Sequence, residues 1–113
     1  MADSCLFCRI VGREIPADIV WEDEHSLAFR DIDPKAPTHV LVIPKAHIAS
    51  LDAATDPMVI GRLALAAAAI ARTEGIAGAG YRTVINTGAD AGQTVFHVHL
   101  HLVGGRALHW PPG

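Results

Sequence analysis

The sequence predicts one α+β domain with a largely antiparallel β-sheet. Three features lead to this prediction: short apolar segments bounded by turn residues, a long helical pattern near the middle of the chain, and strand patterns on both sides of that helix. A chain of 113 residues corresponds to a single domain, spanning 1–113. Such a chain buries roughly two-thirds of the surface that its unfolded form exposes, so it needs no disulfide bonds to fold.

The first half of the chain contains a predicted hairpin and a predicted buried strand. Segments 19–21 and 27–31 read as two strands that are joined by the polar turn 22–26. Segment 33–37 is a predicted turn, because each of its two prolines fixes φ and lacks a backbone donor. The apolar run 40–43 then predicts a buried strand that the next proline ends.

The middle of the chain predicts one amphipathic helix of about five turns. Asp56 is a suitable N-cap, Pro57 fits the first helical position, and Gly75 fits the position just after the helix. After the helix, segments 81–85 and 96–103 are predicted strands, with a glycine-containing loop between them. The apolar residues that recur at helical spacing are Ile60, Leu63, Ala67 and Ile70.

Composition and charge exclude several classes of protein. Half of the residues are hydrophobic and the net charge is −3, which argues against a disordered chain and against the basic surface of a nucleic-acid-binding protein. The N-terminal segment contains no apolar run suited to a signal peptide. The longest apolar run, 63–71, is far shorter than a membrane span. We therefore expect a cytoplasmic protein with no nucleic-acid or membrane partner.

Segment 96–103 contains three of the seven histidines, at alternate positions. Residues two apart on a strand share a face, so His97, His99 and His101 are predicted to line one face while the apolar residues between them pack inward. An amphipathic strand is the simplest interpretation, although such strands usually carry Thr, Lys, Ser or Glu. A zinc site is the second, because His-x-His can direct two nitrogens at one metal ion. Phosphorus chemistry is the third, in which one neutral imidazole is the nucleophile and a neighbouring histidine handles charge and protons.

The loop before this segment favours phosphorus chemistry. Segment 86–94 carries two glycines together with Asn86, Gln93 and Thr94. Taken alone, such a loop is most often an ordinary connection. Next to His97, however, its backbone N–H groups and its amide and hydroxyl side chains predict an anion-binding site. It is not a P-loop, because it lacks the Gly-Lys-Ser/Thr ending and leads into a strand.

The run His-Val-His-Leu-His-Leu-Val at 97–103 resembles the signature of the histidine triad superfamily at every position. Segments 31–48, 91–106 and 109–113 resemble its nucleotide-binding branch, so the likeness covers nearly the whole chain. The resemblance implies a five-stranded, largely antiparallel sheet with one long helix and a short N-terminal helix. It also implies a homodimer with the tail 104–113 at the interface, and hydrolysis of AMP–amine and GMP–amine conjugates, which are purine nucleoside 5′-phosphoramidates.

The resemblance further assigns roles to individual residues, without a metal ion in the chemistry. His99 is the expected nucleophile and forms a nucleotidyl-histidine, while His101 and His39 supply protons and charge, and His97 supports the geometry. Thr94 stands where the branch commonly has serine; it keeps the hydroxyl and adds a stiff methyl group. The other expected nucleotide contacts are Asp31 on the ribose; Asn86, Gly92, Gln93 and Thr94 around the phosphate; Leu6, Phe7, Ile10, Phe29 and Ile32 around the base; and Trp110 from the tail.

The pair Cys5-Leu6-Phe7-Cys8 allows two main interpretations. The two cysteines are either small apolar side chains on a short helix, or thiolate ligands of a structural zinc ion. Relatives of the bacterial type complete such a Cys₂His₂ site with two histidines, which by motif position are His47 and His97. Four protein ligands leave no open position for water, so this zinc is expected to be structural. Redox catalysis is disfavoured, because no thioredoxin-like βαβ pattern surrounds the pair. Zinc is the favoured interpretation.

Two other functions remain open at the level of sequence. One is another reaction of the same superfamily, either hydrolysis of dinucleoside polyphosphates or nucleotidyl transfer. The other is a non-catalytic role as a nucleotide-binding or scaffold protein. The ending at 104–113 favours the phosphoramidase branch over the first of these.

Overall fold

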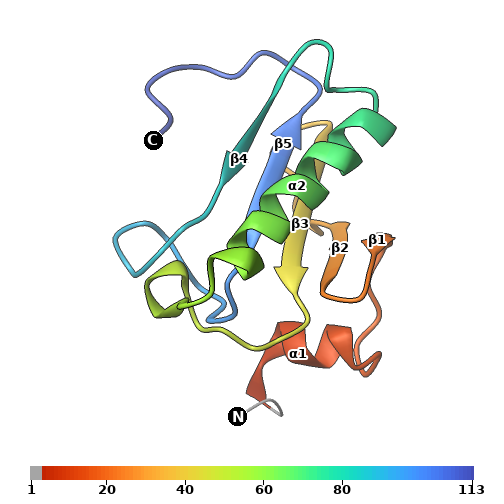
Figure 1. Cartoon of the computed structure of the whole chain (residues 1–113). Coiled ribbons are helices and arrows are strands. Elements are labelled where there is room, and N and C mark those ends of the chain that lie inside the picture. The colour runs from red at the N-terminus through yellow and green to blue at the C-terminus, as the bar shows by residue number, and fades with distance from the viewer. Residues whose placement is uncertain (1–3) are drawn as a thin grey trace.

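The computed structural model describes residues 4–113 and contains a five-stranded antiparallel sheet with the strand order β1-β2-β3-β5-β4 (Figure 1). Two α-helices and the short 3₁₀-helix η2 accompany the sheet. The predicted α+β class, the sheet and the short N-terminal helix are therefore confirmed. The elements are α1 (Leu6–Val11), β1 (Ile19–Glu22), β2 (Ser26–Arg30), β3 (Thr38–Pro44), η2 (Leu51–Ala53), α2 (Pro57–Thr73), β4 (Tyr81–Val84) and β5 (Leu100–Gly104).

The central strand β3 is buried on both faces, and each face belongs to a different apolar cluster. Val40 and Val42 pack with α2, whereas Leu41 and Ile43 pack with α1. This division follows from the alternation of side chains along a strand. Figure 1 shows α2 lying across β3 and β5, and α1 near one end of β2 and β3. The histidine site lies on the face of Leu41, opposite to α2.

The long helix α2 begins and ends as its sequence predicts. The Asp56 carboxylate accepts a hydrogen bond from the backbone N–H of Met58 at 2.9 Å, and Pro57 occupies the first turn. Gly75 follows the C-cap residue with φ +77°, a left-handed conformation that glycine adopts without a steric penalty. The predicted face is buried at Leu63, Ala67 and Ile70, and Ile60 packs at its margin.

Every predicted strand differs from the structure at one end or both, and the differences are largest at β3, predicted as 40–43, and at β5. Strand β3 includes Pro44, which pairs with Ser26 and so forms the last residue of the ladder. Strand β5 begins at Leu100, so the predicted strand 96–103 has an irregular first half. The cause is that this half bonds to the loop after β3 rather than to a neighbouring strand: the Val98 N–H donates to the Ile48 carbonyl at 2.6 Å. The predicted burial is nevertheless correct, since Val98 is buried like Leu100 and Leu102 of β5.

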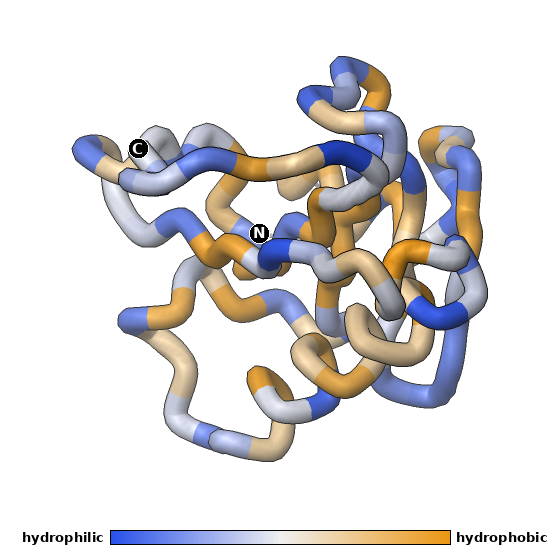
Figure 2. The backbone as a smooth tube through the Cα atoms, turned by 90° about the horizontal axis from the view of Figure 1, so that it is seen from above, coloured by the Kyte–Doolittle hydropathy of each residue, from blue (hydrophilic) through white to orange (hydrophobic). Residues whose placement is uncertain are grey.

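Hydrophobic segments gather in the interior of the fold, and strongly hydrophilic segments lie mostly in the outer loops (Figure 2). Among residues 4–113, no helix has the length and apolar character needed to cross a membrane. After β5 the chain runs past β4 as an extended tail (Figure 1). This tail carries Trp110, whose side chain is 80% exposed.

Candidate active site and metal centre

His99 is held with one ring nitrogen free for chemistry. Its Nδ1 lies 2.9 Å from the backbone carbonyl of His97, which can only accept a hydrogen bond, so Nδ1 carries the proton. The neutral ring therefore has its lone pair on Nε2. The edge of Phe7 packs against the ring at a centroid distance of 5.1 Å, and only 8% of the residue is exposed. The His99 ring is thus held in a fixed orientation with Nε2 as its unprotonated nitrogen.

His39 and His101 form a hydrogen-bonded pair whose proton positions follow from the backbone. The Lys35 N–H donates to His39 Nδ1 at 3.0 Å, so the proton of the neutral His39 ring is on Nε2. That Nε2 lies 2.9 Å from His101 Nδ1 and donates to it. His101 Nδ1 is then an acceptor, and the His101 proton must be on Nε2. The pair consequently presents one N–H group beside His99, whose ring centroid is 5.0 Å from that of His101.

Both rings of this pair are neutral at pH 7. Burial, followed by the charges of the neighbouring His99 and His39, lowers the pKa of His101 to about 4. Burial also lowers the pKa of His39, although Asp31 acts in the opposite direction. The Asp31 carboxylate lies 3.4 Å from His39 Nε2 and so stands close to the shared proton. Asp31, His39 and His101 are also close enough together to suggest a metal site. A metal ion there would need the lone pair of His39 Nε2, but the hydrogen bond from the Lys35 N–H to Nδ1 keeps the proton on Nε2.

The register of the sheet brings this pair together. His39 in β3 lies opposite Val103, and His101 in β5 lies opposite Leu41. The two histidines are therefore diagonal neighbours on one face, a separation that long or ring-shaped side chains can span. The importance of Lys35 was not predicted from the sequence. Its place in the turn 33–37, four residues before His39, was the available signal.

A cavity of about 540 Å³ opens beside the histidines between α1 and β2. It is lined by all six residues that were predicted to surround the base and ribose: Leu6, Phe7, Ile10, Phe29, Asp31 and Ile32. Asp31 is also part of a second cavity, of about 360 Å³, that includes His39, Asn86 and His101. The larger cavity has further walls that the sequence reasoning missed, namely Ile15, Pro16 and Ala17. They form a short apolar run between α1 and β1, and this run was the available signal.

The loop 86–94 is shaped by Gln93. Its side-chain oxygen accepts from the Gly88 N–H at 3.0 Å, and its amide nitrogen donates to the carbonyls of Ala49 and Val95 at 2.9 and 3.2 Å. Gln93 is buried, so its side chain supports the loop rather than facing solvent. Gly92 adopts φ +87°, which glycine tolerates. Thr94 lies in a different cavity, together with Cys5 and His47.

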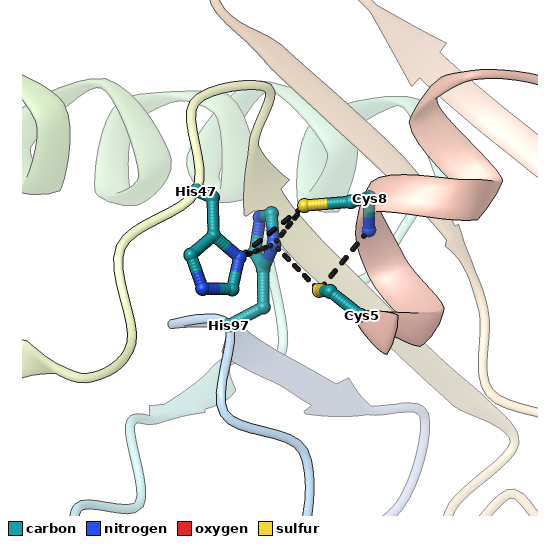
Figure 3. A group of neighbouring side chains, drawn as sticks. All are labelled: Cys5, Cys8, His47 and His97. Carbon is teal, nitrogen blue, oxygen red and sulfur yellow. Dashed lines mark hydrogen bonds between the residues drawn. The ribbon is translucent and has the colours of Figure 1, made fainter. Parts of the chain in front are cut away.

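Cys5, Cys8, His47 and His97 converge on one point (Figure 3). The cysteines come from the start of α1, His47 from the loop after β3, and His97 from the segment before β5 (Figure 3). His97 is fully buried, and its Nε2 donates to the Pro44 carbonyl at 2.8 Å, which leaves the Nδ1 lone pair facing the sulfurs. Burial is the largest cause that lowers the pKa of His97, which favours the neutral ring that a metal ion would need.

The donor set fits a tetrahedral zinc ion. Nδ1 of His97 lies 3.3 Å from Cys5 Sγ, 3.5 Å from Cys8 Sγ and 3.3 Å from His47 Nδ1. Zinc bond lengths give ligand–ligand separations of roughly 3.3–3.8 Å in a tetrahedron. Burial, followed by the hydrogen bond with Cys5, raises the pKa of the Cys8 thiol to about 11, so a cation is needed to make it a thiolate at neutral pH. The structure therefore contains a Cys₂His₂ arrangement suited to a metal ion.

This fold and this arrangement of histidines define a histidine triad protein. The HIT domain model matches residues 12–108, and the chain belongs to this family. It is 56% identical to an uncharacterized HIT-like protein from Synechococcus elongatus, over the full length of both chains. It is 48% identical to the purine nucleoside phosphoramidase of Escherichia coli, over 96% of this chain and 92% of that one.

Solved structures show the same relationship. A HIT family hydrolase from Legionella pneumophila is 49% identical with a TM-score of 0.94, and the match covers 97% of this chain and 100% of that one. A zinc-bound histidine triad family protein from Mycobacterium smegmatis is 40% identical with a TM-score of 0.84, and the match covers 94% of this chain and 78% of that one. The family predicted from the sequence is therefore confirmed.

Proposed function

We propose that this protein hydrolyses the phosphorus–nitrogen bond of purine nucleoside 5′-phosphoramidates, through a nucleotidyl intermediate on His99. The observation that carries this proposal is the pairing of two ring nitrogens of opposite character. His99 presents a bare Nε2, and the neighbouring His101 presents Nε2–H. Cleavage of a P–N bond needs both a nucleophile for phosphorus and a proton for the departing amine. The relationship to the Escherichia coli phosphoramidase supports the same reaction.

The first chemical step transfers the nucleotidyl group to the enzyme. The Nε2 lone pair of His99 forms a bond to phosphorus, the P–N bond breaks, and its electron pair takes the Nε2 proton of His101. The amine leaves neutral. His99 becomes a positively charged nucleotidyl-imidazolium, which offsets the negative charge left on the ring of His101 at a centroid distance of 5.0 Å.

The second step restores the enzyme. A water molecule gives one proton back to His101 Nε2, and its oxygen attacks phosphorus. The bond between phosphorus and His99 then breaks, so His99 regains its lone pair and the nucleoside monophosphate leaves. Over both steps one water is consumed, and the products are one amine and one nucleotide.

The 540 Å³ cavity is the proposed nucleotide site. Its apolar walls suit the faces of a purine, and the Asp31 carboxylate suits a ribose diol, because its oxygens accept hydrogen bonds from both hydroxyl groups. Apolar walls do not read the edge of the base, so AMP and GMP conjugates are both proposed substrates. Asn86 is a further proposed phosphate contact, and its place in the smaller cavity with His101 supports this. Gly92, Gln93 and Thr94 contribute through the loop that ends beside the histidines.

The Cys₂His₂ group is the proposed site of one structural zinc ion. Cys5, Cys8, His47 and His97 would hold it, and no chemical step passes through it. The zinc-bound relative from Mycobacterium smegmatis supports this assignment. We further propose a cytoplasmic homodimer in which Trp110 of each tail approaches the leaving group in the partner's site. The exposure of Trp110 is consistent with such a contact.

Trapping of the intermediate tests the proposed reaction. We expect the wild-type enzyme, mixed with a radiolabelled AMP–amine conjugate and quenched with denaturant, to retain label on the protein. The variant His99→Ala should bind AMP but retain none. Wild-type protein that binds AMP tightly and never becomes labelled would contradict catalysis and favour a binding role. Faster turnover of diadenosine polyphosphates than of AMP–amine conjugates would instead favour the other reaction of the superfamily.

A further inference from the structure

Arg106 reaches the loop that determines where the active-site protons lie. It lies two residues after the end of β5, and its guanidinium donates to the Lys35 carbonyl at 2.9 Å and to the carbonyl of its neighbour Ala107 at 3.0 Å. Lys35 is the residue whose N–H occupies His39 Nδ1. Arg106 itself is exposed, so it contributes little to the apolar core.

The two glycines before Arg106 let the backbone lie directly against this loop. A Cβ on Gly105 would stand 2.9 Å from Pro37 Cβ, and Gly105 has φ +90°, which favours glycine. Gly104 is also closely packed, because its Cβ would meet Ile76 Cδ1 at 2.7 Å and Tyr81 Cβ at 3.4 Å. The end of β5 is thereby fixed from both sides, and it delivers the Arg106 side chain to Lys35. The Gly-Gly-Arg segment therefore acts as one structural unit on the turn 33–37.

The position of the Lys35 N–H decides the tautomer of two rings. A neutral histidine carries one proton, and the partner of one nitrogen determines which nitrogen holds it. With Lys35 in place, the protons lie on His39 Nε2 and His101 Nε2. If Lys35 moved away, His39 could carry its proton on Nδ1 and accept at Nε2. His101 would then donate from Nδ1, and its outer nitrogen would have no proton for the leaving amine.

We propose that Arg106 is a positioning residue that keeps the His101 Nε2 proton in place by anchoring Lys35 over His39. This inference rests on the proposed phosphoramidase function. Arg106 touches no reacting atom; it acts through the loop and the two rings. Its importance should therefore depend on how much the leaving group needs a proton.

Two substrates with different leaving groups test this dependence. An amine conjugate of AMP needs protonation as it leaves, whereas the p-nitrophenyl ester of AMP releases a stable anion. For Arg106→Ala we expect kcat to fall about tenfold on the amine conjugate, the order expected for losing a hydrogen bond with a charged donor. On the ester we expect a change below about twofold, within the usual effect of a surface substitution. The dissociation constant of AMP should remain unchanged.

Two control variants separate this effect from a general loss of charge or structure. Arg72→Ala removes the same side chain from an exposed position in the last turn of α2, away from the histidine face, and should match the wild type on both substrates. Arg106→Lys keeps a cationic donor and should recover part of the lost activity on the amine conjugate. Equal slowing of Arg106→Ala on both substrates would overturn the proposal, as would values equal to those of Arg72→Ala.

The tautomers supply a second readout, which does not depend on turnover. In ¹⁵N spectra of histidine-labelled wild-type protein we expect His39 and His101 to be protonated on Nε2. In Arg106→Ala both should shift toward protonation on Nδ1. Unchanged tautomers in this variant would overturn the proposal. If wild-type protein fails to cleave the amine conjugate, the proposed function fails, and the ¹⁵N result still decides the role of Arg106.

Discussion

Replacing Cys8 by serine should detach α1 while leaving the sheet folded. α1 is only six residues long, and fixing its backbone costs about 1–2 kcal/mol per residue. Its buried side chains are Phe7 and Ile10, and burying each of them contributes about 1.5–3 kcal/mol. Apolar packing therefore falls short of the ordering cost by several kcal/mol. A zinc ion held jointly by α1, His47 and His97 can close this gap, since structural zinc contributes about 10 kcal/mol or more in small domains.

Hydrogen exchange measures the detachment directly. The amide of Gly12 donates to the Cys8 carbonyl at 2.9 Å and that of Arg9 to the Cys5 carbonyl at 3.0 Å, so both report on α1. In zinc-loaded wild-type protein we expect both amides to be protected. In Cys8→Ser, or after chelation, their protection should fall by about 100-fold, which corresponds to roughly 3 kcal/mol. Amides of β3 should keep their protection, and the affinity for AMP should fall because Phe7 and Ile10 line the proposed nucleotide cavity.

Equal protection of the Gly12 and Arg9 amides in zinc-loaded, zinc-stripped and Cys8→Ser protein would refute this reasoning. Such a result would mean that apolar packing alone holds α1. Loss of protection throughout the sheet would refute it in another way, because the metal would then support the whole fold. Metal content measured on the same samples shows whether the wild-type site was loaded.

Three further outcomes are expected. Gly104→Ala should lower the free energy of unfolding by about 1–3 kcal/mol in urea denaturation, because the added Cβ would overlap Ile76. Gly78→Ala is the matched control: its Cβ would have no atom within 4 Å, so the free energy of unfolding should change by less than about 0.5 kcal/mol. Since the pKa of His101 is lowered to about 4, its ring should stay neutral in mild acid; in ¹⁵N spectra of histidine-labelled protein the His101 signals should change only as the pH approaches 4, and a change centred near 6.5 would contradict this. Asp31→Asn should raise KM about tenfold for an AMP conjugate and have little effect on the 2′,3′-dideoxy analogue; an equal increase for both would contradict a ribose contact.

The parts of the fold that were predictable are those whose signals are local. Asp56, Pro57 and Gly75 mark the ends of α2 through backbone chemistry that operates within one turn, and the structure confirms all three. The apolar run at the centre of β3 is equally local. Pro44 shows the limit of such reasoning. Its missing N–H argues against a place in a strand, yet Pro44 pairs with Ser26 as the last residue of the β2–β3 ladder. Its carbonyl is instead used by His97, a partner that is distant in sequence.

The residue types of the candidate site could be predicted from the sequence. The orientations of the histidine rings and the positions of their protons could not. Alternation placed His97, His99 and His101 on one face, and the resemblance supplied their expected roles. The sequence could not show that β5 begins only at Leu100, because the start of this strand depends on the path of the loop after β3. Nor could it show which backbone groups fix the tautomers. The Lys35 N–H and the His97 carbonyl are backbone groups, so the side chains of these residues give no indication of the contacts that they make.

These backbone contacts explain why the segment 96–103 contains a histidine at every second position. His97 uses both ring nitrogens for structure, one on the Pro44 carbonyl and one toward the cysteines, while its own carbonyl fixes His99. His39 likewise commits both nitrogens, and His101 commits one. Among the ring nitrogens of these four residues, all of which lie in the described part of the chain, two therefore remain uncommitted to protein groups. One is a bare Nε2 on His99 and the other a protonated Nε2 on His101, and the proposed transfer of a nucleotidyl group from an amine requires this combination.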